Sequence, residues 1–306
     1  MPKELVDEMM GITQLEHGEH VFHYTSVEAL KGILDGEFWA TEGHFLNDSA
    51  ELFVGRKTIE EVLRIHMHDA NKCERIVNQI IEEVDSLQSA DPTKRIENGY
   101  FGEYIISFSL DSDSELIWSE FTGNKGYCID FDLYELLSAF EGNGSDILHG
   151  KVVYNHEEQI ELVERYISKG FLKAKEYDFL NTWDDFDYMS EEEIKQFCSV
   201  ASVGVLLFDL FFKKRCFSEE HEYRIVFDCM HLLKQRNGCS VEASFREREG
   251  VLLPIIKKKL KSIESIRKII IGPKNNIDIA KRGVQYFMRS KNIAVNVEKS
   301  EIPLRY

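Results

Sequence analysis

Three apolar segments that read as β-strands are interrupted by polar side chains. The segments are residues 21–25 (Val-Phe-His-Tyr-Thr), 105–109 (Ile-Ile-Ser-Phe-Ser) and 220–227 (Glu-His-Glu-Tyr-Arg-Ile-Val-Phe). A strand buried on both faces reads as continuous Val, Ile and Phe, and burying an unpaired carboxylate is costly in free energy. We therefore expect the segments to belong to one sheet, with His23, Ser107 and Glu222 converging on one cleft.

The rest of the chain alternates between predicted strands and helices. The hydrophobic pattern predicts further strands over residues 38–40, 126–132, 151–154, 250–256, 267–272 and 293–297. It predicts helices over residues 114–121 and 277–290, and one that starts at the cap residue Ser26 and stops at Gly36. This mixture indicates an α+β fold with a mixed, largely antiparallel sheet.

Two helical stretches, at about residues 52–98 and 157–213, are too long to be simple connections. In the second, Ser190 and Glu193 have the spacing of a capping box at a helix start. We predict one domain over residues 1–306 that carries these stretches as helical insertions. The insertions are expected to flank the cleft and to set access or partner choice.

Composition places the chain among soluble globular proteins. Hydrophobic residues make up 43% and charged residues 30% of the 306 positions. The most apolar stretch, residues 200–212, is shorter than the roughly 20 residues that span a bilayer. Residues 1–19 lack the pattern of a secretory signal, and none of the six cysteines forms a CxxC pair. We expect a cytoplasmic protein with reduced thiols and no membrane partner.

Charge is distributed unevenly along the chain. The net charge is −17, but residues 251–306 carry 13 Lys/Arg and four Asp/Glu, which makes them +9 and leaves −26 for the rest. An acidic body disfavours an extended nucleic-acid contact. The basic segment can meet an anionic partner locally or form a solvated face against the acidic body. We expect its apolar positions to pack into the sheet; these are Val251, Leu253, Ile255, Ile269 and Ile271. We expect four lysines to stay exposed; these are Lys257, Lys258, Lys259 and Lys261.

A series of short motifs runs in order along about residues 20–275. The motifs are Phe22-His23-Tyr24-Thr25-Ser26, residues 45–51 (Phe-Leu-Asn-Asp-Ser-Ala-Glu), Ser107-Phe108-Ser109 with Trp118, residues 126–131 (Gly-Tyr-Cys-Ile-Asp-Phe), 151–154 (Lys-Val-Val-Tyr), 220–224 (Glu-His-Glu-Tyr-Arg) and 269–272 (Ile-Ile-Ile-Gly). The series resembles a family of uncharacterised bacterial proteins, a domain of unknown function. Two positions depart from the family pattern: Phe217 replaces a tryptophan, and residues 121–124 replace a Tyr-Ala-Asp-like run.

Three tripeptides on predicted strands carry a second resemblance. They are His23-Tyr24-Thr25, Ser107-Phe108-Ser109 and Glu220-His221-Glu222. Their order is similar to that of the ADP-ribosyltransferase fold. In its diphtheria-toxin and poly(ADP-ribose) polymerase branch a His-Gly-Thr or His-Gly-Ser strand holds NAD, and in its arginine-modifying branch a Ser-Thr-Ser strand and a Glu-x-Glu turn act. By this analogy of fold the resemblance implies a split sheet, NAD as substrate, and a site that combines both branches.

The resemblance implies roles at the nicotinamide–ribose bond, whose cleavage passes through an oxocarbenium-like ribose. Glu222 would stabilise that positive charge, Glu220 would orient or deprotonate the acceptor, and His23 would hydrogen-bond a ribose hydroxyl. The other implied residues are Thr25, Ser107 and Ser109 as polar contacts, Tyr24 or Trp118 as a stacking ring, Arg224 as a pyrophosphate ligand, and Asn47 and Asp48 as supporting or substrate-contacting residues.

Each of these residues also has a purely structural explanation. His23 can be a hydrogen-bonded core residue, Trp118 can pack in the core, and Glu222 with Arg224 can form an ordinary ion pair. Asn47 with Asp48 can be a turn that caps the following helix. No HExxH, Walker A or Rossmann glycine motif occurs, and no metal is expected.

The function expected from these observations is an NAD-dependent ADP-ribosyltransferase acting on a macromolecular acceptor, either a protein or a nucleic acid. Related folds suggest a toxin-like role or a role in bacterial antiviral defence, with a regulatory partner protein. Two alternatives stay open. One is an NAD glycohydrolase, which uses water as the acceptor, and the other is a non-catalytic sensor that binds a nucleotide or nucleic acid.

Overall fold

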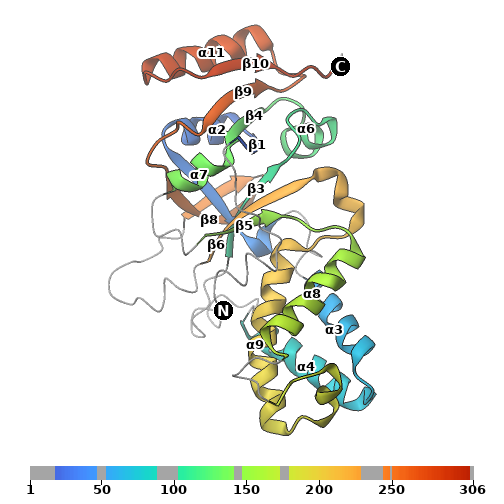
Figure 1. Ribbon diagram of the computed structural model, residues 1–306. Coiled ribbons are helices and arrows are strands. Elements are labelled where there is room, and N and C mark those ends of the chain that lie inside the picture. Colours follow the sequence, from blue (N-terminus) through green and yellow to red (C-terminus); the bar gives the residue numbers. More distant parts are fainter. Residues whose placement is uncertain are drawn as a thin grey trace, which may run out of the picture.

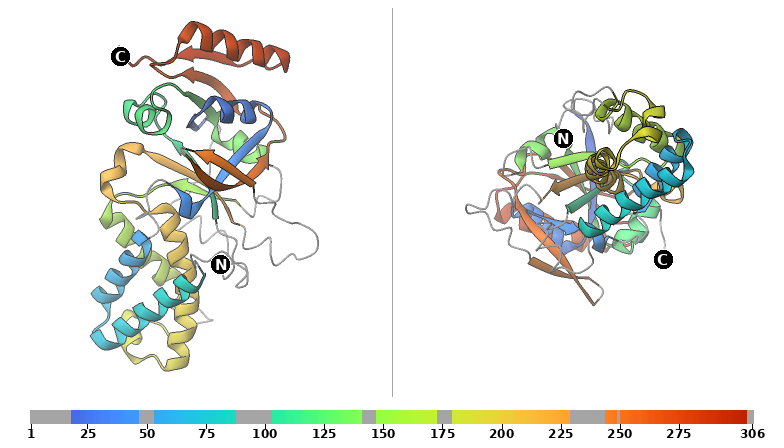
Figure 2. Two further views of the ribbon diagram at one scale, coloured as in Figure 1. Left: turned by 180° about the vertical axis from the view of Figure 1, so that it is seen from behind. Right: turned by 90° about the horizontal axis from the view of Figure 1, so that it is seen from below.

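The computed structural model describes residues 18–46, 53–87, 103–140, 147–172, 179–228, 244–248 and 250–303. These residues form two parts (Figure 1). One is a sheet with its covering helices, here called the sheet lobe. The other is a cluster of four long helices, the helical lobe, which extends from one end of the sheet; Figure 2 shows the same division from behind.

The sheet is mixed and largely antiparallel, as the sequence predicts. Its strands are β1 (His20–Thr25), β2 (Glu37–Glu42), β3 (Glu103–Ser109), β4 (Tyr127–Asp132), β5 (Ile147–Lys151), β6 (Glu222–Asp228), β7 (Ser244–Arg248), β8 (Val251–Lys259), β9 (Ile266–Ile271) and β10 (Asn296–Lys299). The main path runs β10-β9-β4-β1-β3-β2-β8-β7, and β6 pairs with both β3 and β5. Among the described strands only β9 and β10 pair in parallel.

The sheet forks at β3. One edge of β3 pairs with β6 over its whole length, residues 103–109. The opposite edge pairs with β2 only near its start, at Tyr104 and Ile105, and with β1 only at its end, at Ser109. The strands β1 and β2 therefore diverge from each other, and the middle of β3 faces the space between them.

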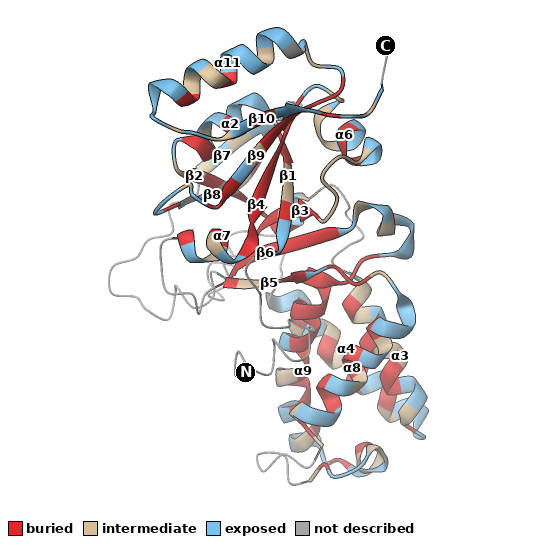
Figure 3. Ribbon diagram, turned by 45° about the horizontal axis from the view of Figure 1, so that its top comes forward, coloured by how far each residue is buried: buried red, intermediate tan, exposed pale blue. Residues whose placement is uncertain are grey.

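Two large apolar clusters hold the molecule together. In the first, α2 (Val27–Leu34), α7 (Leu133–Ala139) and α11 (Ile277–Ser290) pack on one face of the sheet, and the central strands are largely buried (Figure 3). The second cluster fills the helical lobe and reaches the sheet through Ile105 and Val226. Its helices are α3 (Val54–His66), α4 (Ala70–Leu87), α8 (His156–Gly170) and α9 (Glu191–Phe211).

The helical lobe unites helices from both predicted insertions, since α3 and α4 come from the first and α8 and α9 from the second. Of the described helices only α9 is long and apolar enough to cross a membrane. However, 72% of its most apolar stretch is buried inside the structure, as in the core helix of a soluble protein.

Local signals set helix ends where the sequence predicts them. Ser26 caps α2 by accepting a hydrogen bond from the Ala29 amide. Gly36 follows with a φ of 84°, a conformation that glycine adopts without strain. Ser190 and Glu193 form both hydrogen bonds of the capping box at the start of α9.

Other elements differ from the sequence prediction. The strand predicted at 151–154 is wrong, because β5 ends at Lys151 and Val153 forms only an isolated bridge to Phe212. The pattern does not predict β7, a charged strand that forms by pairing with β8. Val251 is 52% exposed rather than packed, because it lies at the end of the β7–β8 pair.

Candidate functional site

A cavity of about 1240 Å³, here called the fork cavity, lies where β1 and β2 diverge from β3. As the sequence predicts, His23, Ser107 and Glu222 all line it. The other predicted residues that line it are Tyr24, Thr25, Ser109, Glu220 and Arg224. Trp118 does not line the cavity, and Asn47 and Asp48 lie outside the described residues.

Glu222 is a buried, ionised carboxylate. Its Oε1 accepts a hydrogen bond from Arg224 Nε at 2.8 Å, and its Oε2 accepts one from Arg224 Nη2 at 2.9 Å. Burial alone raises the pKa of a carboxyl group. The charge and hydrogen bonds of Arg224, with help from Lys213 and Ser107, outweigh burial and lower the pKa of Glu222 to about 2. Glu222 is therefore negatively charged at physiological pH and is no general acid.

Arg224 is not the free pyrophosphate ligand that the sequence predicts. Its side chain is 1% exposed, and two of its nitrogens hold Glu222. The third, Nη1, donates to the Leu210 carbonyl at 2.7 Å. Leu210 lies in the last turn of α9, where carbonyls lack partners within the helix. Arg224 thus joins the cavity wall to the helical lobe.

Lys213 links the two glutamates, and sequence reasoning missed it. Glu220 ends a short 3-10 helix, and His221 has a left-handed φ of 42°, so Glu220 and Glu222 do not lie on one extended strand. Lys213 Nζ instead lies 2.6 Å from Glu220 Oε2 and 3.5 Å from Glu222 Oε2. A single lysine after an apolar helix is a weak signal, because only the fold brings it to the carboxylates.

His23 lies in the fork and is neutral at pH 7. Its Nδ1 is 2.9 Å from the Ser107 carbonyl oxygen. Since a carbonyl only accepts, Nδ1 carries the proton and Nε2 is an acceptor, which has no partner among the described residues. Burial lowers the pKa of His23 to about 4; the Ser107 carbonyl opposes this shift, and the positive charge of Arg246 adds to it.

Of the two predicted stacking rings, Trp118 lies away from the cavity, which corrects the prediction for this residue, whereas Tyr24 lines the cavity with its hydroxyl already hydrogen-bonded. Trp118 is fully buried, packs edge-on against Tyr24 at 4.8 Å between ring centroids, and donates to Asp113. The Tyr24 hydroxyl donates to the Asp111 carbonyl and accepts from the Ser114 amide. The aromatic residues that line the cavity besides Tyr24 are Phe22, Phe38, Trp39, Phe45, Phe108, Phe121, Phe217 and Phe245.

The three predicted hydroxyl residues differ in availability. The Ser109 hydroxyl donates to the Glu220 carbonyl and accepts from the Asp111 amide, so it shapes the turn before β6. The Ser107 hydroxyl hydrogen-bonds the Glu222 carboxylate and helps to lower its pKa. Thr25 is 7% exposed and borders the cavity.

The strand β7 adds two arginines that sequence reasoning does not single out. Arg246 and Arg248 lie on the same face of β7 and line the cavity. Arg246 Nη2 donates to Thr41 Oγ1 at 2.9 Å, whereas its Nε is buried without a partner in the described part of the chain. A buried donor left unsatisfied costs about 1–3 kcal/mol. The alternating charges of β7 carry no functional signal, because pairing with β8 alone brings them to the fork.

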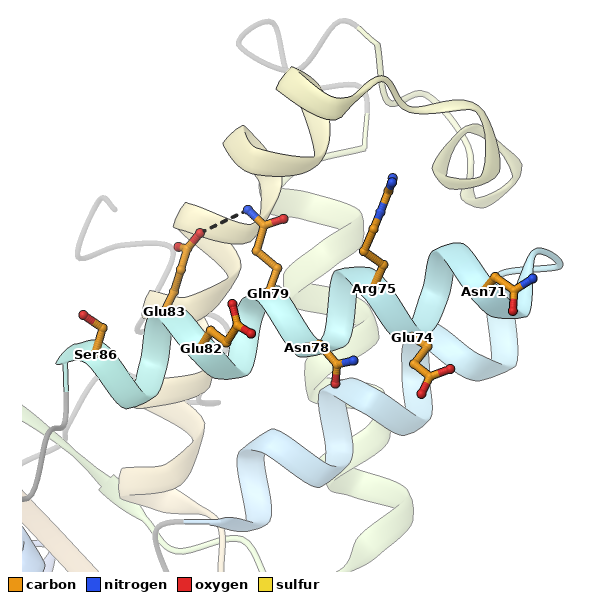
Figure 4. Close-up of a pocket in the computed structure, with 8 residues that line it drawn as sticks. All are labelled: Asn71, Glu74, Arg75, Asn78, Gln79, Glu82, Glu83 and Ser86. Carbon is orange, nitrogen blue, oxygen red and sulfur yellow. Dashed lines mark hydrogen bonds between the residues drawn. The ribbon is translucent and has the colours of Figure 1, made fainter.

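A second hollow, of about 720 Å³, lies along α4 (Figure 4). One helix lines it with polar side chains, of which Gln79 donates to Glu83 at 3.5 Å. None of the predicted residues lies there. No group of three His, Cys, Asp or Glu residues in the described ranges could hold a metal ion. The fork cavity is therefore the candidate site.

Comparison with known proteins finds a match to one family model over part of the chain and indicates no activity. Residues 117–225 match a family described as "Protein of unknown function (DUF2971)". The match confirms the predicted resemblance to an uncharacterised domain family, over a shorter range than residues 20–275. It contains Lys213, Glu220 and Glu222 but not His23 or Ser107. No curated protein and no solved structure matches the chain.

Proposed function

We propose that the fork cavity binds NAD and that the protein cleaves the nicotinamide–ribose bond, transferring ADP-ribose to a macromolecular acceptor. One observation carries the proposal: His23, Ser107 and Glu222 lie far apart in the sequence, on three strands, and line a single cavity. Its volume of about 1240 Å³ exceeds the roughly 300–1,000 Å³ of common ligand pockets, which leaves room for a dinucleotide. The fork at β3 also fits the split sheet that the ADP-ribosyltransferase resemblance implies.

Glu222 suits charge stabilisation rather than proton transfer. Cleavage leaves positive charge on the ribose, and a carboxylate that stays ionised can stabilise it. The Glu220 side chain is 16% exposed against 8% for Glu222, so Glu220 is the more accessible carboxylate. In this proposal Glu220 orients the acceptor, and Lys213 fixes its position beside Glu222.

His23 supplies a hydrogen-bond acceptor to the ribose. Its Nδ1 proton is committed to the Ser107 carbonyl, and Nε2 is the atom left for a ligand. Because a ribose hydroxyl can donate to Nε2, His23 binds it without being protonated. Two neighbouring strands thus cooperate, since β1 carries His23 and β3 carries the carbonyl that orients it.

A non-catalytic nucleotide sensor is the second candidate, and the bonds to Glu222 favour it. Both oxygens of Glu222 accept hydrogen bonds from Arg224, and Lys213 adds a second positive charge at 3.5 Å. These charges weaken the field that Glu222 exerts on a ribose cation. An NAD glycohydrolase differs from the leading proposal only in using water as the acceptor.

The basic segment favours a protein acceptor over a nucleic acid. Lys257 lines the cavity, but its Nζ lies 3.0 Å from Glu37 and 5.6 Å from the Trp39 ring centroid. Lys258 is partly buried and lies over the Phe227 ring. The lysines therefore do not form one continuous phosphate-binding face. The setting that we propose is the cytoplasm, in a toxin-like or defence role.

Incubating the pure protein with NAD and measuring free nicotinamide tests the proposal. Release together with attachment of labelled ADP-ribose to lysate proteins supports the transferase, and release without attachment supports the glycohydrolase. NAD binding without release identifies the sensor. If NAD neither binds nor is consumed, the transferase, the glycohydrolase and a sensor of NAD are all wrong.

A further inference from the structure

The cations that line the fork cavity differ in whether a carboxylate holds them. Lys213 lies against Glu220, and Arg224 against Glu222. Lys257 lies against Glu37, at 3.0 Å. Within the described residues, the two remaining cations, Arg246 and Arg248, have no carboxylate partner.

We propose that Arg246 and Arg248 form an anion subsite that binds the phosphate groups of a phosphorylated nucleoside. The identity of that nucleoside as NAD rests on the proposed function, but the subsite itself requires only a phosphate-bearing ligand. A guanidinium presents donors in a planar fork that matches phosphate oxygens, and two guanidiniums on one strand face can share a pyrophosphate.

The neighbouring groups hold Arg246 in place without neutralising it. Thr41 Oγ1, on β2, accepts from Arg246 Nη2 at 2.9 Å and fixes the guanidinium plane. Glu247 borders the cavity, but its Oε1 accepts from the Gly250 amide. A buried Nε without a partner in the described chain indicates a position built for a ligand rather than for an internal ion pair.

The subsite lies next to the predicted ribose contact. His23 and Arg246 line the same cavity, and the positive charge of Arg246 contributes to the lowered pKa of the His23 imidazole. A phosphate on Arg246 and a ribose hydroxyl on His23 Nε2 can therefore belong to one nucleotide. Glu222, on β6, lines the same cavity as the arginines on β7, so a dinucleotide can contact both groups.

Calorimetric titration of the full chain with inorganic pyrophosphate tests the subsite. We expect millimolar or tighter binding to the wild type, at least tenfold weaker binding to Arg246→Met and to Arg248→Ala, and no change in Arg289→Ala, an exposed arginine on α11. The Met substitution keeps an unbranched apolar stem and removes the guanidinium. Adenosine, which lacks phosphate, should bind the wild type and Arg248→Ala equally.

A measurement on the wild type covers the case in which a variant does not fold. Phenylglyoxal modifies accessible arginines, and peptide mass spectrometry should show that pyrophosphate protects Arg246 and Arg248 but not Arg289. The subsite is wrong if the wild type does not bind pyrophosphate, or if all variants bind it equally. It is also wrong if pyrophosphate does not protect Arg246 and Arg248 from phenylglyoxal. Intact pyrophosphate binding together with no nicotinamide release would overturn the catalytic proposal alone and leave the subsite standing.

Discussion

Single residues in the fork cavity are defined by the partners that they have or lack. Glu222 accepts two hydrogen bonds from Arg224. Removing either charge therefore deprives the other, buried charge of this ion pair. His23 has the opposite character, because its ring is neutral and keeps one acceptor nitrogen for a ligand. The two residues therefore call for different tests.

Replacing Glu222 with Gln removes the carboxylate that holds two nitrogens of Arg224, whereas Lys213 keeps its ion pair with Glu220. Removing one partner of such a pair costs about 3–5 kcal/mol, so urea unfolding should show a marked loss of stability. Nicotinamide release should fall on the order of 10²-fold or more. The double variant Glu222→Gln with Arg224→Met separates the effects: stability should return in part while activity does not. If activity returns with stability, Glu222 acts only through folding.

His23 should stay neutral across the physiological range. Because its pKa is lowered to about 4, its ring NMR signals should titrate near that pH, below the usual value of 6.5. Nicotinamide release should accordingly show no inflection from His23 between pH 5 and 8, although His23→Ala should reduce it at least about tenfold, the loss of one good hydrogen bond. An inflection near pH 6.5 that disappears in His23→Ala would contradict this.

At the scale of elements, α8 and α9 in the helical lobe meet through an aromatic ring that packs on a glycine. Gly204 on α9 packs against the ring of Tyr166 on α8, and a Cβ at Gly204 would lie 2.4 Å from Tyr166 Cε1. Gly283 on α11 is also helical, but a Cβ there meets nothing within 4 Å. The same change, glycine to alanine, can therefore be compared at a tightly packed position and at an open one.

We expect Gly204→Ala and Gly283→Ala to change stability in opposite directions. At Gly283 the better helix propensity of alanine should stabilise by up to about 1 kcal/mol. At Gly204 the overpacking against Tyr166 should cost about 1–3 kcal/mol, more than the propensity gain. Urea unfolding of both variants measures the difference, and stabilisation by Gly204→Ala would show that α8 and α9 separate without cost.

The sequence predicts elements whose signals are local. The strands β1, β3 and β6 are predictable because His23, Ser107 and Glu222 interrupt apolar runs. The start of α9 is predictable because its capping box spans only four residues. Lys213 and Arg246 were not predicted, since an ordinary lysine or arginine acquires meaning only from residues far away in the chain. The turn at His221 likewise escaped notice, because a left-handed histidine has no distinctive sequence pattern.

At the scale of the whole molecule, one buried acid should make stability depend on pH. Asp209 on α9 is fully buried, accepts from the Gly55 amide at 2.7 Å, and lies 3.6 Å from Arg56. Burial raises its pKa to about 8, although Arg56 and the backbone hydrogen bonds oppose the shift. Between pH 4 and 8 the folded state holds a proton that the unfolded chain releases. The stability that this proton contributes is therefore lost as pH rises toward 8.

Asp209→Asn should remove this dependence while keeping the acceptor for Gly55. Relative to the wild type, the variant should gain stability between pH 5.5 and 8, with a slope of up to about 1.4 kcal/mol per pH unit. Urea unfolding of both proteins at the two pH values measures the difference. If the difference in unfolding free energy between variant and wild type is the same at pH 5.5 and pH 8, Asp209 is ionised in the folded state throughout this range.

The end of α9 connects the helical lobe to the cavity wall. Its last turn carries the negative end of the helix dipole, and there the Leu210 carbonyl holds Arg224. Two residues beyond the helix, Lys213 holds Glu220 and approaches Glu222. A helix of 21 residues is about 30 Å long, so a slight tilt at its far end moves these groups together. We therefore expect a protein that binds the helical lobe to shift Arg224 and Lys213 and to change the electrostatic potential at the cavity wall.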